Sequence, residues 1–293
     1  MAARSTRHEF AVRNYDLAAT LDSGQAFRWE ARAGEWTGIV GRRWVALRQS
    51  EAGIEARTGE AVADWRWLAD YLQVEADLAA MLASFPDDEP MRAAVAACRG
   101  LRLLRQDPWE CLASFILSST KQIVQIRQII GELCRRYGAA VAVPAGEAAG
   151  FAFPTAAALA RVPEAELRDC RMGFRAPYLR EAARRVAAGE VKLDALSWIT
   201  LDAARAELTR LPGVGPKVAD CVLLFSCGQP TAFPVDVWVM KALQQLYFPR
   251  RRVTLPRMRR FAATHFGPHA GYAQQYLFHY MRKSAERVGK AGA

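Results

Sequence analysis

Hydrophobic positions follow two different periods along the chain, and the period changes near residue 100. Residues 35–41 and 43–49 combine β-branched and aromatic side chains, and glycines punctuate them, a pattern typical of strands joined by turns. Residues 60–84 then take a helical period that ends before Pro86. The first hundred residues therefore predict an antiparallel sheet accompanied by helices.

From about Leu101 onward the hydrophobic period is helical. Asp107 is expected to cap a helix that has Pro108 at its first position. The apolar stripe of that helix consists of Cys111, Leu112, Phe115 and Ile116. The next helix runs to a stop at Gly138, with apolar residues at helical spacing: Ile123, Ile126, Ile130 and Leu133. Short helices follow, and a long helix is expected over about residues 269–288.

Together these patterns predict an α+β fold without an internal repeat. The 293 residues are enough for two domains at roughly 100–200 residues each. We expect an N-terminal antiparallel α+β domain over residues 8–97. An all-helical domain is expected to follow over residues 98–290.

Composition narrows the class of protein further. Apolar residues make up 52% of the chain and charged residues 24%, which excludes a disordered or low-complexity protein. Apolar stretches stay short of the ~18 residues of a membrane span, and no signal-peptide pattern opens the chain. We expect a soluble protein of the cytoplasm, associated with the nucleoid if the source is bacterial, and no membrane partner.

Cysteine and histidine usage bears on metal sites. The six cysteines form no C-x-x-C pair, and the chain has only four histidines. This pattern predicts no zinc or iron–sulfur site, and free thiols in a reducing compartment.

The positive charge is concentrated at the C-terminal end of the chain. Residues 240–293 carry eleven basic residues and one acidic residue, whereas the other 239 residues carry 29 of each sign. Such a concentration favours a polyanionic partner, nucleic acid first, although a solvated basic helix face is the alternative. A membrane surface is disfavoured because Pro249, Pro256 and Gly267 interrupt the stretch.

One glycine-rich segment predicts contact with a DNA backbone. Residues 211–217 read Leu-Pro-Gly-Val-Gly-Pro-Lys and join two expected helices over about 202–211 and 216–227. Gly213, Val214 and Gly215 would bring backbone amides close to a phosphate, at the positive end of the second helix dipole. This is the helix–hairpin–helix pattern of sequence-independent DNA binding, although a short turn of this kind is often only structural.

Two residues beside the hairpin are candidates for chemistry. Lys217 falls in the first turn of the second helix, where the dipole disfavours the protonated amine, so Lys217 is a candidate nucleophile. Asp236 is placed to cap a helix from Val237 to about Phe248. Each residue alone fits a solvated lysine or an ordinary cap, but both beside a DNA-binding hairpin favour catalysis.

At this point the chain resembles a known superfamily. Residues 211–221 followed by Pro234-Val235-Asp236 resemble the helix–hairpin–helix–Gly/Pro–Asp DNA glycosylases. Within that superfamily the chain resembles the 8-oxoguanine DNA glycosylase/AP lyase family, because residues 23–29, 103–108 and 267–274 also match. The resemblance covers about residues 10–280.

The resemblance implies a bifunctional enzyme that acts on duplex DNA containing an oxidised purine. Lys217 would attack C1′ of the damaged nucleotide, expel the base and form a Schiff base, from which β-elimination cuts the strand. Asp236 would stabilise positive charge on the sugar and help to orient Lys217. This chemistry needs no metal and no other cofactor, and such enzymes usually act as monomers.

The resemblance also implies a pocket for the base after it leaves the stack. The backbone carbonyl of Gly24 would accept the N7–H that distinguishes 8-oxoguanine from guanine. Cys221 and Phe278 would pack on the two faces of the base. Gln274 would read its Watson–Crick edge.

On the opposite strand, this chain departs from the family pattern. Phe174 and Arg175 match the pair that wedges into the stack and reads the orphaned cytosine. Thr120 stands where animal and fungal members carry an asparagine that fills the vacated space, and Gln125 replaces a second cytosine-reading arginine. Each lost bidentate contact removes about 1–3 kcal/mol of discrimination, so we expect a relaxed preference for cytosine opposite the lesion.

Two other functions remain open on the sequence. A monofunctional glycosylase for alkylated or mispaired bases keeps the aspartate but lacks the hairpin lysine, so Lys217 argues against it. A non-catalytic helix–hairpin–helix module would need neither Lys217 nor Asp236.

Overall fold

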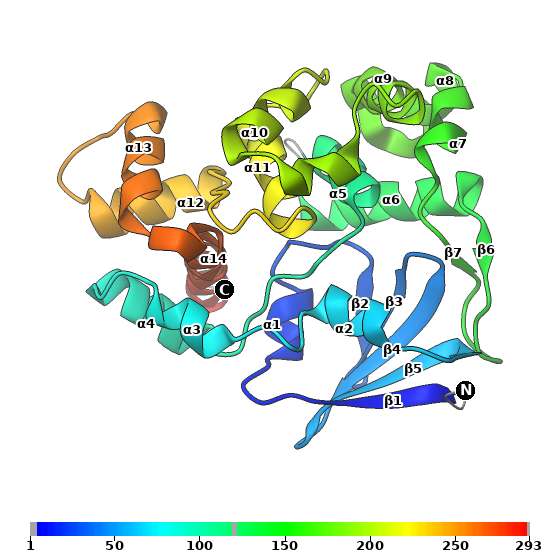
Figure 1. The fold of residues 1–293 in the computed structure, drawn as a ribbon, viewed down its shortest axis with the longest axis horizontal. Coiled ribbons are helices and arrows are strands. Elements are labelled where there is room, and N and C mark those ends of the chain that lie inside the picture. Colours follow the sequence, from blue (N-terminus) through cyan, green and yellow to red (C-terminus); the bar gives the residue numbers. More distant parts are fainter. Residues whose placement is uncertain (1–4, 119–121, 292–293) are drawn as a thin grey trace.

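The computed structural model describes residues 5–118 and 122–291. Its N-terminal part contains a five-stranded antiparallel sheet with the strand order β1-β5-β4-β3-β2 (Figure 1). The strands are β1 (Ser5–Ala11), β2 (Trp29–Arg32), β3 (Glu35–Val40), β4 (Arg43–Gln49) and β5 (Gly53–Val62). The sheet expected from the β-branched and aromatic residues at 35–49 is therefore present, with β4 at its centre and β3 beside it.

A close approach between two strands explains one of the glycines in this sheet. Trp29 of β2 pairs with Gly38 of β3 and is almost fully buried. A Cβ atom at Gly38 would come within 2.6 Å of the Trp29 ring. The Trp29 indole also donates to the hydroxyl of Tyr71 at 2.9 Å, so the ring fastens the sheet to helix α2 (Arg66–Leu72).

The helical stretch expected over residues 60–84 is confirmed only in part. Strand β5 continues to Val62, and two helices follow it, α2 and α3 (Leu78–Ala83). Helix α2 ends at Gln73, which adopts a left-handed conformation, and Asp77 then caps α3 by accepting from Ala80 N at 3.0 Å. Both ends are set by backbone geometry and a local cap, which the helical period alone does not reveal.

The remainder of the chain is mainly helical. Its α-helices are α4 (Glu89–Ala97), α5 (Pro108–Leu117), α6 (Ile123–Tyr137), α7 (Ala156–Arg161), α8 (Glu164–Leu167), α9 (Ala176–Ala187), α10 (Leu201–Thr209), α11 (Pro216–Phe225), α12 (Val237–Ala242), α13 (Leu255–His265) and α14 (Ala270–Ala291). Short π-helical or 3₁₀ turns cover Arg168–Met172, Gly173–Arg175, Leu193–Trp198, Leu243–Tyr247 and Gly267–His269. A two-stranded sheet of β6 (Ala140–Val141) and β7 (Gly150–Phe151) interrupts the helices, and α1 (Leu17–Leu21) lies in the N-terminal part.

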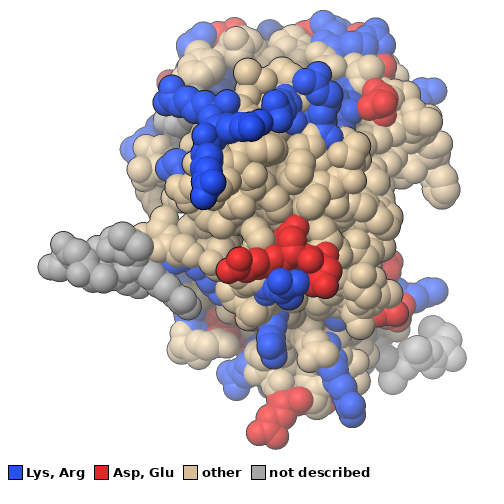
Figure 2. Space-filling view, turned by 90° about the vertical axis from the view of Figure 1, so that its left-hand side faces the viewer, with Lys and Arg blue, Asp and Glu red and all other residues tan. Residues whose placement is uncertain are grey.

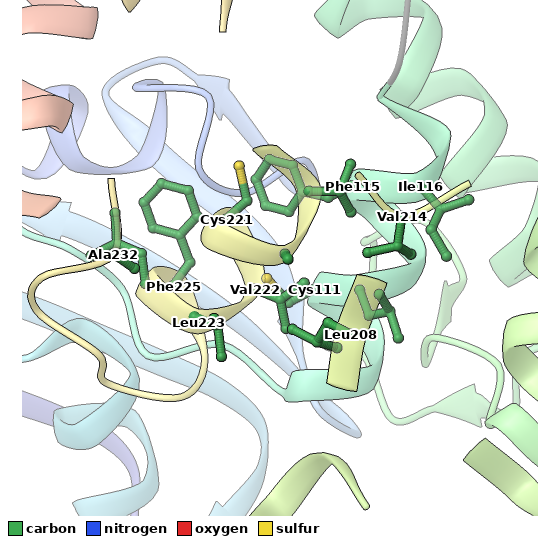
Figure 3. Close-up of a cluster of buried hydrophobic side chains, with 14 of the residues drawn as sticks. Cys111, Phe115, Ile116, Leu208, Val214, Cys221, Val222, Leu223, Phe225 and Ala232 are labelled. Atoms are coloured by element: carbon green, nitrogen blue, oxygen red, sulfur yellow. The ribbon is translucent and has the colours of Figure 1, made fainter. Parts of the chain in front are cut away.

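Helices α5 and α11 form the centre of the helical core. Figure 3 shows Cys111, Phe115 and Ile116 of α5 against Val222 and Leu223 of α11, with Leu208 of α10 beside them. These side chains are at most 4% exposed. Burial of each larger apolar side chain contributes roughly 1.5–3 kcal/mol, so this cluster fixes the position of α11.

Two hydrophobic clusters divide the molecule. The smaller cluster lies between the sheet, α1 and α2, and includes Trp29, Leu47 and Leu68. The larger cluster extends through the helical part and includes Met91 of α4, which packs beside α14. The domain boundary between residues 97 and 98 stays a prediction. Helix α4 precedes that boundary in the sequence, but its side chains belong to the helical core.

Candidate active site

The glycine-rich hairpin joins α10 to α11 as the sequence predicts. Gly213 has a φ of +78°, and a Cβ atom there would lie 2.7 Å from the Tyr178 ring of α9. Val214 is buried and points into the core beside Ile116 (Figure 3). Gly215 is the N-cap of α11, and no side chain caps that helix end. The first-turn amides of α11 are therefore not occupied by a capping side chain.

Lys217 lies in the first turn of α11 and reaches toward α5. Its Nζ atom donates to Ser118 Oγ at 3.3 Å and stands 5.0 Å from the centre of the Phe115 ring. The Phe115 ring in turn stacks on Phe225, with ring centres 5.6 Å apart. The amine therefore rests on an aromatic surface that the core holds in place.

Asp236 is the N-cap of α12, as expected from its position. Its Oδ1 atom accepts from Val239 N at 2.8 Å. Burial raises the pKa of Asp236 above its ordinary value, while backbone donors and the nearby charge of Lys217 oppose this rise. The helix that Asp236 caps is shorter than expected, because α12 ends at Ala242 and continues as a π-helical turn to Tyr247.

A single cavity of about 450 Å³ brings the two candidate catalytic residues together. Lys217 and Asp236 both line it. So do all four residues expected in the base pocket: Gly24, Cys221, Gln274 and Phe278. The four pocket residues come from the turn after α1, from α11 and from α14. More than 250 residues of sequence separate Gly24 from Phe278.

The walls of the cavity differ in chemistry. Gly24 has a φ of +78°, and a Cβ atom there would lie 3.4 Å from Phe278 and would narrow the cavity. Figure 3 shows Cys221 beside the rings of Phe115 and Phe225, and burial raises the pKa of its thiol to about 12. Gln274 is 3% exposed, and its Oε1 atom has no hydrogen-bond partner among the described residues. The cavity thus offers apolar faces and one buried acceptor.

Sequence reasoning missed several residues of this cavity. Ser118, Trp238 and Arg282 also line it, together with Phe115, which was expected only in the core. One signal was available: Gln274, Phe278 and Arg282 are spaced i, i+4 and i+8, and therefore lie along one face of α14. Ser118 likewise follows Phe115 by three residues, as the C-cap of α5.

The described residues among those expected on the opposite strand do not line the cavity. Phe174 is 56% exposed, whereas Arg175 is 2% exposed, with its guanidinium 4.3 Å from the centre of the Phe174 ring. Gln125 Oε1 accepts from the backbone N–H of Gln122 at 3.2 Å and closes a capping box at the start of α6. Thr120 lies outside the described residues.

An arginine-rich surface lies beyond the cavity. Figure 2 shows basic side chains gathered in a band across the upper part of the face on which α13 lies. We define the arginine surface by five exposed residues: Arg250, Arg251, Arg252, Arg257 and Arg260. From Val237 to Ala285 the sequence contains no Asp or Glu, so no acidic neighbour in sequence offsets this charge.

Two further findings concern the residues that the structure describes. Among them, no group of three or more Cys, His, Asp or Glu side chains is arranged to hold a metal ion. No described helix has the length and apolar character that crossing a bilayer requires.

Comparison with known families covers most of the chain. Residues 8–112 match the N-terminal domain of 8-oxoguanine DNA glycosylase. Residues 113–265 match the HhH-GPD superfamily of base excision DNA repair proteins. The chain is 33% identical over 283 residues to an N-glycosylase/DNA lyase of Arabidopsis thaliana, covering 89% of this chain and 76% of the relative. It is 35% identical to a probable N-glycosylase/DNA lyase of Methanothermobacter thermautotrophicus, covering 69% and 70%.

Solved structures agree with these matches. The 8-oxoguanine glycosylase/lyase of Clostridium acetobutylicum, bound to duplex DNA with cytosine opposite 8-oxoguanine, superposes with a TM-score of 0.88. Its sequence is 32% identical, and the superposition covers 93% of each chain. A 3-methyladenine DNA glycosylase of Archaeoglobus fulgidus has a TM-score of 0.73 over 94% of this chain and 98% of that one, and at 22% identity it shares the fold alone.

Proposed function

The chain belongs to the 8-oxoguanine DNA glycosylase family of the HhH-GPD superfamily, and we propose that Lys217 and Asp236 carry its chemistry. The enzyme excises 8-oxoguanine from duplex DNA and cleaves the strand, as an N-glycosylase/DNA lyase of base-excision repair. The observation that carries the assignment of residues is that Lys217 and Asp236 line the same cavity.

In the proposed reaction the lone pair of the Lys217 amine attacks C1′ of the damaged nucleotide. The C1′–N9 bond breaks, and its electron pair leaves with the base, which takes up a proton. The C1′–O4′ bond then breaks and the sugar ring opens, O4′ takes up the proton that the amine loses, and a protonated Schiff base remains. Loss of a C2′ proton then drives cleavage of the C3′–O3′ bond, so the strand is cut on the 3′ side of the lesion.

Asp236 serves the same step as a fixed negative charge. Positive charge develops on the sugar while the C1′–N9 bond breaks, and a carboxylate facing the cavity stabilises it. The cap to Val239 N holds one oxygen of Asp236 in place without help from the substrate. Asp236 and Lys217 make no direct ion pair in the described part of the chain, so the sugar can enter between them.

The cavity fits a guanine-type base better than adenine. The buried Oε1 atom of Gln274 is an acceptor, and the Watson–Crick edge of guanine presents N1–H and N2–H donors. Adenine presents an unprotonated N1 at the same edge. We infer that the Gly24 carbonyl accepts the N7–H of 8-oxoguanine, while Cys221 and Phe278 cover the two faces of the base.

We infer that three surfaces hold the duplex. The amides of the hairpin, at residues 213–215, bind phosphate at the start of α11. The exposed Phe174 ring enters the stack beside the flipped nucleotide, and the buried Arg175 guanidinium packs against that ring. The arginine surface attracts the flanking phosphates. We propose that the enzyme acts as a monomer and works in the cytoplasm, or on the nucleoid if the source is bacterial.

Borohydride trapping tests the assignment of Lys217. Duplex DNA containing 8-oxoguanine is incubated with the protein and sodium borohydride, which reduces a Schiff base to a stable covalent adduct. We expect an adduct with the unsubstituted protein and none with Lys217→Gln. Base release without an adduct would instead indicate a monofunctional glycosylase, and DNA binding without either reaction would indicate a non-catalytic module.

A further inference from the structure

Asp22 lies where three walls of the base cavity meet. Its carboxylate accepts from Arg127 of α6 at 3.1 Å through one oxygen, and from Arg282 of α14 at 3.0 Å through the other. Asp22 stands two residues before Gly24, in the turn that follows α1. One carboxylate therefore connects α6, α14 and the Gly24 turn.

Arg282 is both a partner of Asp22 and a wall of the cavity. Its side chain is 12% exposed, and it lines the cavity together with Phe278, one helical turn earlier on α14. A Cβ atom at Gly24 would lie 3.5 Å from Arg282 Nη1 and 3.5 Å from Ile123 Cδ1 of α6. The Gly24 turn is thus packed between the same two helices that Asp22 joins.

The backbone after Asp22 is also held by neutral groups, one of them on α14 itself. Gln275 Nε2 donates to Ser23 O at 2.9 Å, and Gln106 Nε2 donates to Gln25 O at 2.7 Å. Gln25 is fully buried and itself donates to Arg102 O at 2.8 Å. These bonds fix the two ends of the turn, and the Asp22 carboxylate adds the charged links to α6 and α14.

We propose that Asp22 is a positioning residue for lesion recognition, which sets the Gly24 carbonyl against the α14 wall through Arg282 and Arg127. Arg282 is, in the same arrangement, a specificity-determining residue of the cavity. The proposal rests on the function proposed above, because it concerns how the N7–H of 8-oxoguanine is read. The side chains of Arg127 and Asp22 are partly exposed, whereas the side chain of Arg282 is the least exposed of the three.

The expected consequence follows from hydrogen-bond geometry. An N–H···O bond needs a donor–acceptor distance of about 2.7–3.2 Å, so a shift of the turn by ~1 Å loses the bond to N7–H. That bond is what separates 8-oxoguanine from guanine in the pocket. A substitution at Asp22 should therefore reduce selectivity for the lesion, whereas cleavage at a preformed abasic site, which places no base in the pocket, should be spared.

The test compares Asp22→Asn with a matched control on α6. Glu132→Gln is the control, because Glu132 also pairs with two arginines, Arg135 and Arg136, but does not line the cavity. Fluorescence anisotropy gives the Kd for duplexes containing 8-oxoguanine or guanine, with Lys217→Gln as the non-reacting background. Borohydride trapping on an abasic duplex, with Lys217 intact, reports the amine chemistry separately.

We expect Asp22→Asn to lower the ratio of the guanine Kd to the 8-oxoguanine Kd by about tenfold, the equivalent of one hydrogen bond. Abasic trapping should stay within about twofold of the unsubstituted protein, and Glu132→Gln should change neither readout. Arg282→Met should lower the Kd ratio similarly, and adding Asp22→Asn to it should cause little further loss.

Four outcomes would overturn the proposal, and the first three concern the Kd ratio. They are an unchanged Kd ratio in Asp22→Asn, an equal loss of selectivity in Glu132→Gln, or fully additive effects of Asp22→Asn and Arg282→Met. A parallel loss of abasic trapping and of melting temperature would also overturn it, since Asp22 would then serve folding only. If the unsubstituted protein gives no abasic trapping at all, the proposed function fails, and that result is distinct from any Asp22 outcome.

Discussion

The Nζ atom of Lys217 donates to Ser118 Oγ at 3.3 Å, across the interface between α11 and α5. Ser118 directly follows α5, whose Phe115 ring lies 5.0 Å from the same Nζ atom. Neutral groups therefore hold the amine on one side of the cavity, while Asp236 faces it from the start of α12. Among the described residues the amine and the carboxylate make no ion pair with each other, and we expect the sugar to enter between them.

Replacing Asp236 by Asn should separate catalysis from folding. Asn keeps an oxygen that can accept from Val239 N, so the melting temperature should change little. The charge that stabilises the sugar is lost, and we expect single-turnover excision to fall about 100-fold or more. Excision at the normal rate in Asp236→Asn would contradict the role proposed for the carboxylate.

The pH dependence of excision provides a control for the same residue. Burial raises the pKa of Asp236, so on acidification the carboxylate is protonated at a higher pH than an ordinary aspartate. Excision should therefore decline on the acidic side as Asp236 takes up its proton. In Asp236→Asn the residual activity should decline less steeply over the same range. Measurement of single-turnover rates across the acidic range checks both expectations.

Excision should depend weakly on the base opposite the lesion. Gln125 replaces a cytosine-reading arginine of the family pattern, and its side chain is engaged in capping α6. We expect nearly equal rates opposite all four bases, and Gln125→Arg should raise the preference for cytosine by about 1–3 kcal/mol. Single-turnover assays on four duplexes measure this. A cytosine preference of about a hundredfold or more in the unsubstituted protein would contradict the prediction.

The arginine surface should control salt-dependent binding rather than catalysis. Arg257 and Arg260 are exposed on α13. Replacing both by Gln should reduce the slope of log K against log salt by about 1 for each lost phosphate contact. Arg32→Gln, on the exposed strand β2, is the control and should leave the slope unchanged. An unchanged slope in the double variant would remove the arginine surface from the DNA interface.

His279 should make the protein less stable in acid. It is 2% exposed, neither ring nitrogen has a partner among the described residues, and burial lowers its pKa to about 4. The unfolded chain, with a histidine pKa near the ordinary 6.5, binds a proton in this range while the folded chain does not. Stability should therefore fall by about 2 kcal/mol between pH 7 and pH 5.

Urea unfolding at the two pH values measures this effect. His279→Leu should be at least as stable as the unsubstituted protein at pH 7, because it removes two unpaired buried nitrogen atoms. It should also lose less stability at pH 5. An equal loss in both proteins would show that another group carries the acid sensitivity.

Local signals explain why the hairpin and its helices could be predicted from the sequence. Asp107 and Asp236 each accept from the backbone N–H three residues ahead, which is a geometry fixed by the neighbouring residues alone. The positive φ of Gly213 in the hairpin is likewise a local property of the backbone, which favours glycine. The pocket residues Gly24, Cys221, Gln274 and Phe278 were placed through the family resemblance, and the fold brings them into one cavity.

Other features depend on contacts that the sequence does not display. Arg282 belongs to a basic terminal stretch typical of a solvated helix face, yet its side chain is only 12% exposed, and Asp22, 260 residues away, accepts its hydrogen bond. Ser118 was missed because its meeting with Lys217 spans 99 residues. The break between α2 and α3 depends on the left-handed backbone of Gln73, a conformation that glutamine rarely adopts.

Peptide mapping of the borohydride-reduced adduct tests the central assignment most directly. The chain has six lysines: Lys121, Lys192, Lys217, Lys241, Lys283 and Lys290. We predict that mass spectrometry of the digested adduct places the sugar remnant on Lys217 alone, and that Lys217→Gln yields no adduct. A remnant on another lysine or on the N-terminal amine, or an undiminished adduct in Lys217→Gln, would contradict Lys217 as the nucleophile.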